Sequence, residues 1–256
     1  MGRAVSLLGV GVDVVDLPEC LRIVGEWITA RRPAYICLAP AHNLMACRAD
    51  PKLRQVFNRA TLVVPDGMGT VWFLRLLGHK AGRVYGPDLM LAACRRGLES
   101  GWRHFFLGGT SQVADMLVSR LKADFPALQV AGVLSPPFRE LSKNEKDAMV
   151  DQINMAWSDI VWVGLGSPKQ EFWMAEFRQR LQAPVLIGVG AAFDFLSGAK
   201  PQAPKWIQRM GLEWLFRLVT EPRRLWRRYA GYPLFVALAA AQLVGLANYS
   251  IEEEAN

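Results

Sequence analysis

Six short apolar runs, separated by longer segments with helical periodicity, constrain the fold of this chain more than any other feature. The runs cover residues 34–39, 61–65, 104–107, 129–134, 160–164 and 185–189. Helical periodicity marks 88–98 and 112–123, and a capping box at 142–145 opens another helix. Strands that alternate with helices predict an α/β fold with a doubly wound, mostly parallel, Rossmann-like sheet.

A change of composition near residues 201–204 predicts a domain boundary. We expect a Rossmann-like core over 1–202 and a C-terminal appendage over 203–256 that is basic, aromatic and helical. Between residues 200 and 229 there are eight basic and two acidic side chains, so this segment has a net charge of +6, and the whole chain has a net charge of +7. Its interleaved tryptophans and leucines favour an anionic membrane surface over nucleic acid, with a solvated basic helix as the alternative.

The uncharged run at 229–251 follows the basic segment. Its strongly apolar part, 234–247, has 14 residues and contains Gln242, whereas a membrane-spanning helix needs ~20 predominantly apolar residues. We therefore expect this run to lie in the membrane interface, with a membrane span as the alternative.

The N-terminus and the cysteines indicate a cytoplasmic protein. Asp13 and Asp16 come early and no small-residue cleavage site follows, so we expect neither a signal peptide nor export. The four cysteines form no C-x-x-C pair and lie in apolar contexts, which is typical of reduced, packed thiols.

Polar residues follow several of the predicted strands. Asp66 comes directly after the 61–65 run, where ligands bind in open α/β sheets, although its local sequence alone favours a helix N-cap. Gly108 and Gly109 follow the third run, where free backbone N–H groups could meet a phosphate or form a plain tight turn. Gln170 follows the fifth run and Asp194 follows the sixth. Taken alone, Gln170 and its neighbour Glu171 indicate the exposed surface of a first helical turn, and Asp194 indicates a helix cap.

Dinucleotide-dependent oxidoreduction and metal chemistry are disfavoured. Two G-x-G patterns, at 9–11 and 188–190, are followed by Val14 and Phe193 where the fingerprint needs a small residue. The sequence has no D-x-D, no H-E-x-x-H and no clustered His or Cys, so we expect no metal site. Protein cations would then have to neutralise a bound diphosphate.

Taken together, the motifs resemble the WecG/TagA/CpsF glycosyltransferases, in order along nearly the whole chain. They are PDGMG at 65–69, RVYGPDLM at 83–90, HFFLGG at 104–109, WVGLGSPKQEFW at 162–173, GVGAAFDF at 188–195 and APKWIQRMGLEWLFRLVTEPRRLWRRY at 203–229. The resemblance implies an inverting transfer of a sugar from a UDP-sugar donor to a polyprenyl-diphosphate-linked glycan precursor, without a metal or other cofactor. It also implies that the protein acts in the synthesis of cell-surface polysaccharides or exopolysaccharides and binds peripherally to the inner face of the cell membrane. A homo-oligomer is compatible with this function.

The resemblance also implies roles for individual residues. Asp66 matches the family's proposed general base, which takes the proton of the acceptor hydroxyl. Gln170 matches a position that holds the sugars, and Asp194 matches one near the ribose. Three appendage arginines match positions thought to face the diphosphate: Arg217, Arg224 and Arg227.

The sequence departs from the family at Pro40, which stands where an Asn that contacts the sugar is common. Proline has no N–H and no polar side chain, so His42 or Asn43 takes that role or the sugar is held differently. The donor sugar is therefore open among N-acetylmannosamine, a hexose and a uronic acid. The competing hypothesis is a non-catalytic sugar-nucleotide-binding module of a polysaccharide assembly complex.

Overall fold

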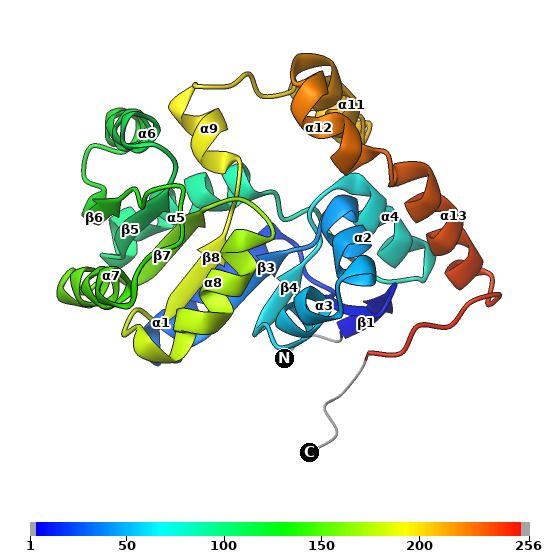
Figure 1. Ribbon diagram of the computed structural model, residues 1–256, viewed down its shortest axis with the longest axis horizontal. Coiled ribbons are helices and arrows are strands. Elements are labelled where there is room, and N and C mark those ends of the chain that lie inside the picture. The colour runs from blue at the N-terminus through cyan, green and yellow to red at the C-terminus, as the bar shows by residue number, and fades with distance from the viewer. Residues whose placement is uncertain (1–3, 252–256) are drawn as a thin grey trace. The chain divides into compact units, whose positions relative to one another are not determined.

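The computed structural model describes residues 4–251, in which helices and strands alternate through the middle of the chain (Figure 1). The strands are β1 (Ala4–Leu7), β2 (Val10–Asp13), β3 (Ala34–Leu38), β4 (Leu62–Val64), β5 (Arg103–Gly108), β6 (Gln129–Leu134), β7 (Ile160–Gly164) and β8 (Val185–Gly188). The helices are α1 (Leu17–Thr29), α2 (Ala41–Ala49), α3 (Pro51–Asn58), α4 (Met68–Leu76), α5 (Gly86–Ser100), α6 (Ser111–Asp124), α7 (Lys143–Met155), α8 (Lys169–Phe177), the 3₁₀ turn η1 (Arg178–Arg180), α9 (Ala192–Ser197), α10 (Lys205–Arg209), α11 (Glu213–Thr220), α12 (Pro222–Tyr229) and α13 (Tyr232–Leu243).

The main sheet confirms the predicted fold class. Its strand order is β4-β3-β8-β7-β5-β6, and the pairs β3–β8, β8–β7, β7–β5 and β5–β6 are all parallel. The six predicted apolar runs coincide with β3 to β8 to within one residue at either end. Every residue of β3, β4 and β8 is buried, which explains why these strands appear as continuous apolar runs rather than alternating ones.

The chain divides into two compact units, each assembled from segments that are distant in sequence. The first contains the described parts of 1–17, 38–85 and 202–256, and the second contains 18–37 and 86–201. The C-terminal segment thus belongs to the same unit as α2, β4 and α4. The predicted boundary between a core and an appendage at 202/203 stays a prediction.

An antiparallel hairpin, β1–β2, opens the first unit, in a segment for which no strand was predicted from the sequence. Leu7 pairs with Val10 across a two-residue turn, and both turn residues, Leu8 and Gly9, have positive φ (54° and 85°). Positive φ at both central positions is typical of a type I′ turn. The Gly9-Val10-Gly11 pattern therefore belongs to a hairpin, with Gly9 in the turn and Val10 and Gly11 in β2, and does not start a dinucleotide-binding helix.

Helix α13 is fixed to the body of the first unit. It contacts α2 and α4, and the side-chain amide of Gln242 donates to Ser6 O (2.8 Å) and accepts from Leu8 N (3.1 Å). Gln242 interrupts the apolar run because it satisfies the backbone of the hairpin. At 1.5 Å per residue the helix is about 18 Å long, against about 30 Å of bilayer core. No helix within residues 4–251 has the length and apolar character to cross a membrane.

In the second unit, a buried arginine holds the chain that leads into β8. Arg178 donates to four backbone carbonyls, those of Ala34 (3.0 Å), Leu181 (2.7 Å), Ala183 (2.5 Å) and Pro184 (3.3 Å). Burial lowers the pKa of its guanidinium to about 10. The arginine stays charged at neutral pH and serves the fold of this unit.

Two smaller predictions are also confirmed. Ser142 and Glu145 form a complete capping box at the start of α7. Cys20, Cys37, Cys47 and Cys94 are buried and take part in no disulfide, as expected for packed thiols.

Candidate active site

Asp66 lies at the carboxyl end of β4, between a buried strand and the start of α4. The N-cap of α4 is Gly67, with φ 88°, a backbone conformation that favours glycine. The helix-cap interpretation of Asp66 is therefore wrong, because the residue precedes the cap. The carbonyl of Pro65 accepts from Val84 N (2.9 Å), which ties this loop to the segment carrying Arg83.

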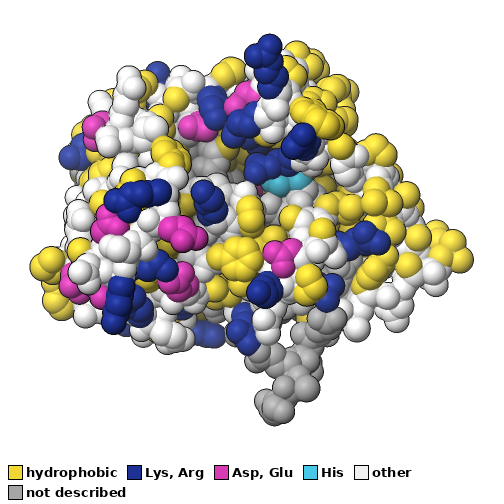
Figure 2. Space-filling view, in the orientation of Figure 1, with side chains coloured by type: hydrophobic (Ala, Val, Ile, Leu, Met, Phe, Trp, Pro, Cys, Tyr) yellow, Lys and Arg dark blue, Asp and Glu magenta, His cyan; other side chains and the backbone are white. Residues whose placement is uncertain are grey.

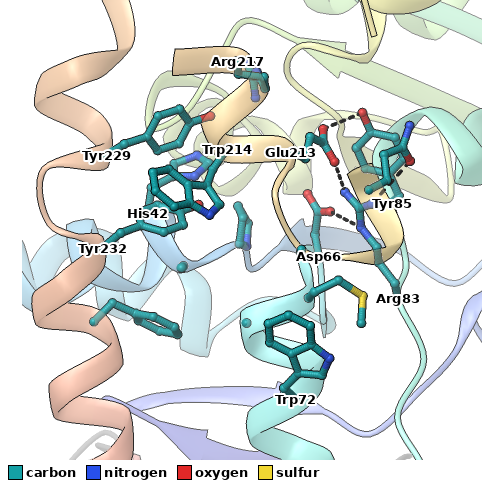
Figure 3. A pocket seen from close by; sticks show the side chains of 18 of the residues that line it. His42, Asp66, Trp72, Arg83, Tyr85, Glu213, Trp214, Arg217, Tyr229 and Tyr232 are labelled. Atoms are coloured by element: carbon teal, nitrogen blue, oxygen red, sulfur yellow. Dashed lines mark hydrogen bonds and ion pairs between the residues drawn. The ribbon is translucent and has the colours of Figure 1, made fainter. Parts of the chain in front are cut away.

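A pocket in the first unit surrounds Asp66 with side chains from three regions of the sequence (Figure 3). The loop before α2 and the first turn of α2 supply one wall, the β4–α4 segment and residues 83–85 supply another, and α10 to α13 supply the rest. Its lining consists of Pro40, Ala41, His42, Asp66, Gly67, Met68, Gly69, Trp72, Arg83, Tyr85, Gln208, Gly211, Glu213, Trp214, Arg217, Tyr229, Tyr232, Phe235 and Val236. The C-terminal segment thus completes the site around Asp66.

On one side of the pocket, two carboxylates point toward a single arginine (Figure 3). Arg83 Nε lies 3.7 Å from Asp66 Oδ1, and Arg83 Nη2 forms a short ion pair with Glu213. Tyr85 donates its hydroxyl to Glu213 Oε1 (2.7 Å), and the Arg83 guanidinium lies 4.0 Å from the centre of the Tyr85 ring. Glu213, on the first turn of α11, is thereby connected to the segment that follows α4.

The surroundings of Asp66 make its carboxyl group weakly acidic. Burial raises its pKa to about 7; the charge of Glu213 adds to this effect, while Arg83, Arg217 and the Gly67 N–H oppose it. Its side chain keeps 16% of its surface exposed, so solutes can reach it. A carboxyl group with a pKa near neutrality can exchange a proton at physiological pH, which is the property that general acid–base catalysis requires.

Aromatic rings form the opposite side of the pocket (Figure 3). Tyr229 contacts both His42 and Tyr232 edge to face, with centroid distances of 6.0 and 5.2 Å, and Trp214 lies 5.1 Å from Tyr232. Burial, reinforced by the charges of Arg228 and Arg217, keeps the pKa of His42 well below its usual value. His42 is therefore a neutral imidazole, and its buried Nδ1 has no hydrogen-bond partner within the described residues.

The structure separates the other predicted residues of the first unit. Arg217 lines the pocket. Arg224 is exposed and paired with Glu221 (Nε to Oε2, 2.6 Å), and the exposed Arg227 stacks on Trp226. Asn43 is buried and donates to Leu38 O (3.0 Å). Among the described residues, Arg224, Arg227 and Asn43 do not line this pocket.

The remaining predicted residues gather at the carboxyl edge of the sheet in the second unit. Gln170 and Glu171 open α8 but are buried, so their assignment to a helix surface is wrong. Gln170 donates to Glu171 (2.9 Å) and accepts from Gly190 N (3.0 Å), which joins the ends of β7 and β8. Asp194 is in the first turn of α9, whose N-cap is Ala191, and pairs with Lys200 (2.7 Å), so its cap interpretation is also wrong.

Tight packing alone requires glycine at the end of β5. A Cβ on Gly108 would lie 2.5 Å from the backbone of Gly164 in the neighbouring strand β7, and the residue has φ 125°. Gly109 continues the turn with φ 68° and donates to Gly164 O (3.3 Å). The plain-turn interpretation accounts for both glycines, and their phosphate-binding role stays a prediction.

Sequence reasoning missed most of the groups that surround Asp66: Arg83, Tyr85, Glu213, Trp214, Tyr229 and Tyr232. Two signals were available. Arg83 and Tyr85 stand together in the RVYG motif, and Glu213 is one of only two acids within the strongly basic 200–229 segment. An isolated acid in a basic segment indicates a specific partner.

Comparison with known proteins identifies the family. The model of the glycosyl transferase WecG/TagA/CpsF family matches residues 5–249, so the chain belongs to that family. Two relatives, from Bacillus spizizenii strain W23 and Bacillus subtilis strain 168, are each 30% identical over 211 residues, or 82% of this chain and 80% of theirs. Each is named an N-acetylglucosaminyldiphosphoundecaprenol N-acetyl-beta-D-mannosaminyltransferase. The chain is a glycosyltransferase, and the pocket around Asp66 is its candidate active site.

No three His, Cys, Asp or Glu side chains within residues 4–251 are grouped so that they could hold a metal ion. The charged groups that the pocket offers to a ligand are the guanidinium groups of Arg83 and Arg217 and the carboxylates of Asp66 and Glu213. Metal independence itself stays a prediction.

Proposed function

We propose that this glycosyltransferase moves a sugar from a UDP-sugar to an acceptor linked to polyprenyl diphosphate, with inversion at the anomeric carbon. Membership of the family and the names of the two Bacillus relatives support the class of acceptor. The observation that carries the proposal is Asp66, a carboxyl group with a pKa of about 7 at the end of a buried strand, inside a pocket.

In the proposed step, Asp66 accepts the proton of the acceptor hydroxyl as its oxygen attacks the anomeric carbon. The new carbon–oxygen bond forms on the face opposite the leaving group, and the bond to UDP breaks with its electron pair on the diphosphate. A general base is most efficient when its pKa lies near the working pH, as it does here. Attack from the opposite face accounts for inversion.

Arginines are proposed to stabilise the charge that develops on the diphosphate. Arg217 is already in the lining of the pocket, and Arg224 and Arg227 stand exposed on the neighbouring helix α12. Guanidinium groups form strong, charge-assisted hydrogen bonds to phosphate oxygens. The reaction would then need no metal ion.

His42 is proposed to contact the transferred sugar. It is a neutral imidazole whose Nδ1 has no partner among the described residues, and Pro40, two residues earlier, lines the same pocket. The sugar could be N-acetylmannosamine, as in the names of the relatives, a hexose or a uronic acid. His42→Phe should lower kcat/KM for the accepted sugar while leaving the Kd for UDP within a few-fold of wild type. Equal loss of UDP affinity would contradict this role.

The C-terminal segment is proposed to bind the cytoplasmic face of the membrane peripherally. Hydrophobic side chains cover part of the surface over α13, with Lys and Arg side chains over α11 and α12 (Figure 2). Trp206 and Trp226 are 62% and 54% exposed, and Val219 is 73% exposed. Exposed tryptophans beside basic residues suit an anionic lipid interface, where each basic residue adds ~1 kcal/mol.

Vesicle sedimentation tests the membrane proposal. The double variant Trp206→Ala/Trp226→Ala should bind anionic vesicles at least about tenfold more weakly than wild type, because two interfacial anchors are lost. Trp157→Ala is the matched control, since Trp157 is 60% exposed but lies in the second unit. Equal binding by all three proteins would contradict the proposal.

A donor screen tests the function itself. The purified chain is mixed with each of a set of UDP-sugars and a short-chain polyprenyl diphosphate carrying one sugar, and products are read by mass spectrometry. We expect one donor to give an acceptor heavier by one sugar residue. If UDP or a UDP-sugar binds but no donor is turned over, the chain is a sugar-nucleotide-binding module and the proposed function is wrong.

A further inference from the structure

Arg83 stands between two carboxylates that are far apart in the sequence. Asp66 follows β4, whereas Glu213 begins α11, and Arg83 forms ion pairs with both. The two contacts differ in kind. Nη2 is hydrogen-bonded to Glu213, whereas Nε lies 3.7 Å from Asp66 Oδ1, beyond normal hydrogen-bond length.

Several contacts hold Arg83 and Glu213 in this arrangement. Tyr85 donates its hydroxyl to the second oxygen of Glu213 (2.7 Å), and the face of its ring supports the guanidinium of Arg83. Gln208 accepts from Arg83 Nη1 (3.4 Å). The side chains of Arg83 and Glu213 are only 16% and 13% exposed. The pair is therefore largely shielded from water, and its charges act strongly on neighbouring groups.

We propose that Glu213 is a positioning residue of the active site, which holds the guanidinium of Arg83 off Asp66 so that Asp66 remains a competent base. This inference rests on the proposed function of Asp66. An Asp that shares bidentate hydrogen bonds with an arginine is stabilised in its ionised form and accepts protons poorly. By taking the hydrogen bond from Arg83, Glu213 leaves Asp66 with a weaker, purely electrostatic contact.

The other charged groups near Asp66 shift its pKa in opposite directions. The charge of Arg217 stabilises the ionised Asp66, as does the Gly67 N–H, whereas the charge of Glu213 destabilises it. His42, Tyr85, Tyr229 and Tyr232, which line the same pocket, are neutral near pH 7, because burial moves the pKa of His42 down and those of the tyrosines up. Apart from Asp66 itself, Glu213 is thus the one carboxylate among the pocket-lining residues, and its charge opposes those of the two arginines.

The inference predicts opposite effects from two substitutions. Glu213→Gln removes a negative charge and frees Arg83 to bind Asp66, so the acidic limb of the kcat/KM profile should move to lower pH by about one unit, with a lower plateau. Arg83→Gln removes the cation that opposes proton uptake, so the limb should move to higher pH. Glu176→Gln is the control, because Glu176 forms an exposed ion pair with Lys146 in the second unit.

A titration that needs no turnover separates this inference from the proposed function. The carboxyl carbons of Asp are labelled with ¹³C, and the Asp66 signal is assigned from its absence in Asp66→Asn. We expect its midpoint to fall in Glu213→Gln, to rise in Arg83→Gln and to stay unchanged in Glu176→Gln. If Glu213→Gln does not fold, Tyr85→Phe, which loses one hydrogen bond to Glu213, should shift the midpoint in the same direction by a smaller amount.

The inference would be overturned if the Asp66 midpoint were unchanged in both Arg83→Gln and Glu213→Gln, or if it shifted in the same direction in both. Tyr85→Phe takes the place of Glu213→Gln in this comparison if that variant does not fold. If the midpoints shift oppositely but no UDP-sugar is turned over by the wild type, the positioning of Arg83 stands and the proposed function fails. If Glu213→Asp keeps the wild-type pH profile of kcat/KM while Glu213→Gln shifts it, the charge of residue 213 is what matters.

Discussion

Replacement of Asp66 by Asn should stabilise the folded protein at alkaline pH while it removes activity. The pKa of Asp66 is raised from an ordinary value of 3.8 to about 7, chiefly by burial. Because the folded-state pKa is the higher one, the favourable contribution of the neutral carboxyl group is fully present below about pH 4. It is lost as the pH rises through about 7, since the buried group must then ionise.

The structure sets the size of this effect. The pKa shift is about 3 units, and each unit corresponds to ~1.36 kcal/mol, so ionisation of Asp66 costs up to about 4 kcal/mol above pH 8. The side chain is 16% exposed, so the cost realised is nearer to about 2–4 kcal/mol. Asn cannot ionise, so Asp66→Asn escapes this cost altogether.

Urea unfolding, followed by tryptophan fluorescence, measures the free energy of unfolding of both proteins between pH 5 and pH 8.5. We expect an advantage for Asp66→Asn of about 1 kcal/mol at pH 5 that grows to about 2–4 kcal/mol at pH 8.5, where its melting temperature should be at least about 5 °C higher. Asp115→Asn, on the exposed surface of α6, is the charge-matched control. A pH-independent difference between Asp66→Asn and wild type would refute the raised pKa.

Three further predictions concern the fold and the reaction. Arg178→Met should lower the free energy of unfolding by about 3 kcal/mol or more in urea, because it removes the side-chain donor to four buried carbonyl groups, of which Pro184 O alone is known to keep a second donor, Ala34 N. Stability unchanged from wild type would show that these carbonyls do not need the arginine. Gln242→Leu should lower the free energy of unfolding by about 1–3 kcal/mol, since Ser6 O and Leu8 N lose their hydrogen-bond partner. A gain in stability would mean that burial of the leucine outweighs the loss of these two hydrogen bonds. Transfer should persist in excess EDTA, and a strict requirement for Mg²⁺ or Mn²⁺ would show that arginines alone do not neutralise the diphosphate.

Most of the sheet could be predicted from the sequence, because parallel strands buried on both faces appear as continuous apolar runs. The run at 160–164 coincides with β7 at both ends, and four of that strand's five residues are buried. The β1–β2 hairpin could not be predicted in this way. Its turn is Leu8-Gly9 rather than Asn-Gly or Asp-Gly, and its strands have four residues each, too few to show a clear period.

The candidate site could be predicted only where a local motif carries it. Asp66 stands at the end of a strand and before glycine, and both features are visible in the sequence. The partners that raise or oppose its pKa come together through tertiary contacts. Glu213 is 130 residues from Arg83 and 128 from Tyr85, and no local pattern pairs them. The buried first turn of α8 was missed for a related reason, because Gln170 and Glu171 satisfy each other inside the protein.

Turnover by Asp66→Asn, compared with wild type at pH 8, tests the central claim most directly. The assay uses the donor identified by the screen and the lipid-linked acceptor, with UDP affinity measured in parallel by calorimetry. Asn preserves the shape of the side chain but cannot accept the proton, so we expect kcat to fall ~10² to 10⁴-fold while the Kd for UDP stays within a few-fold. Turnover by Asp66→Asn within a few-fold of wild type would show that Asp66 is not the base.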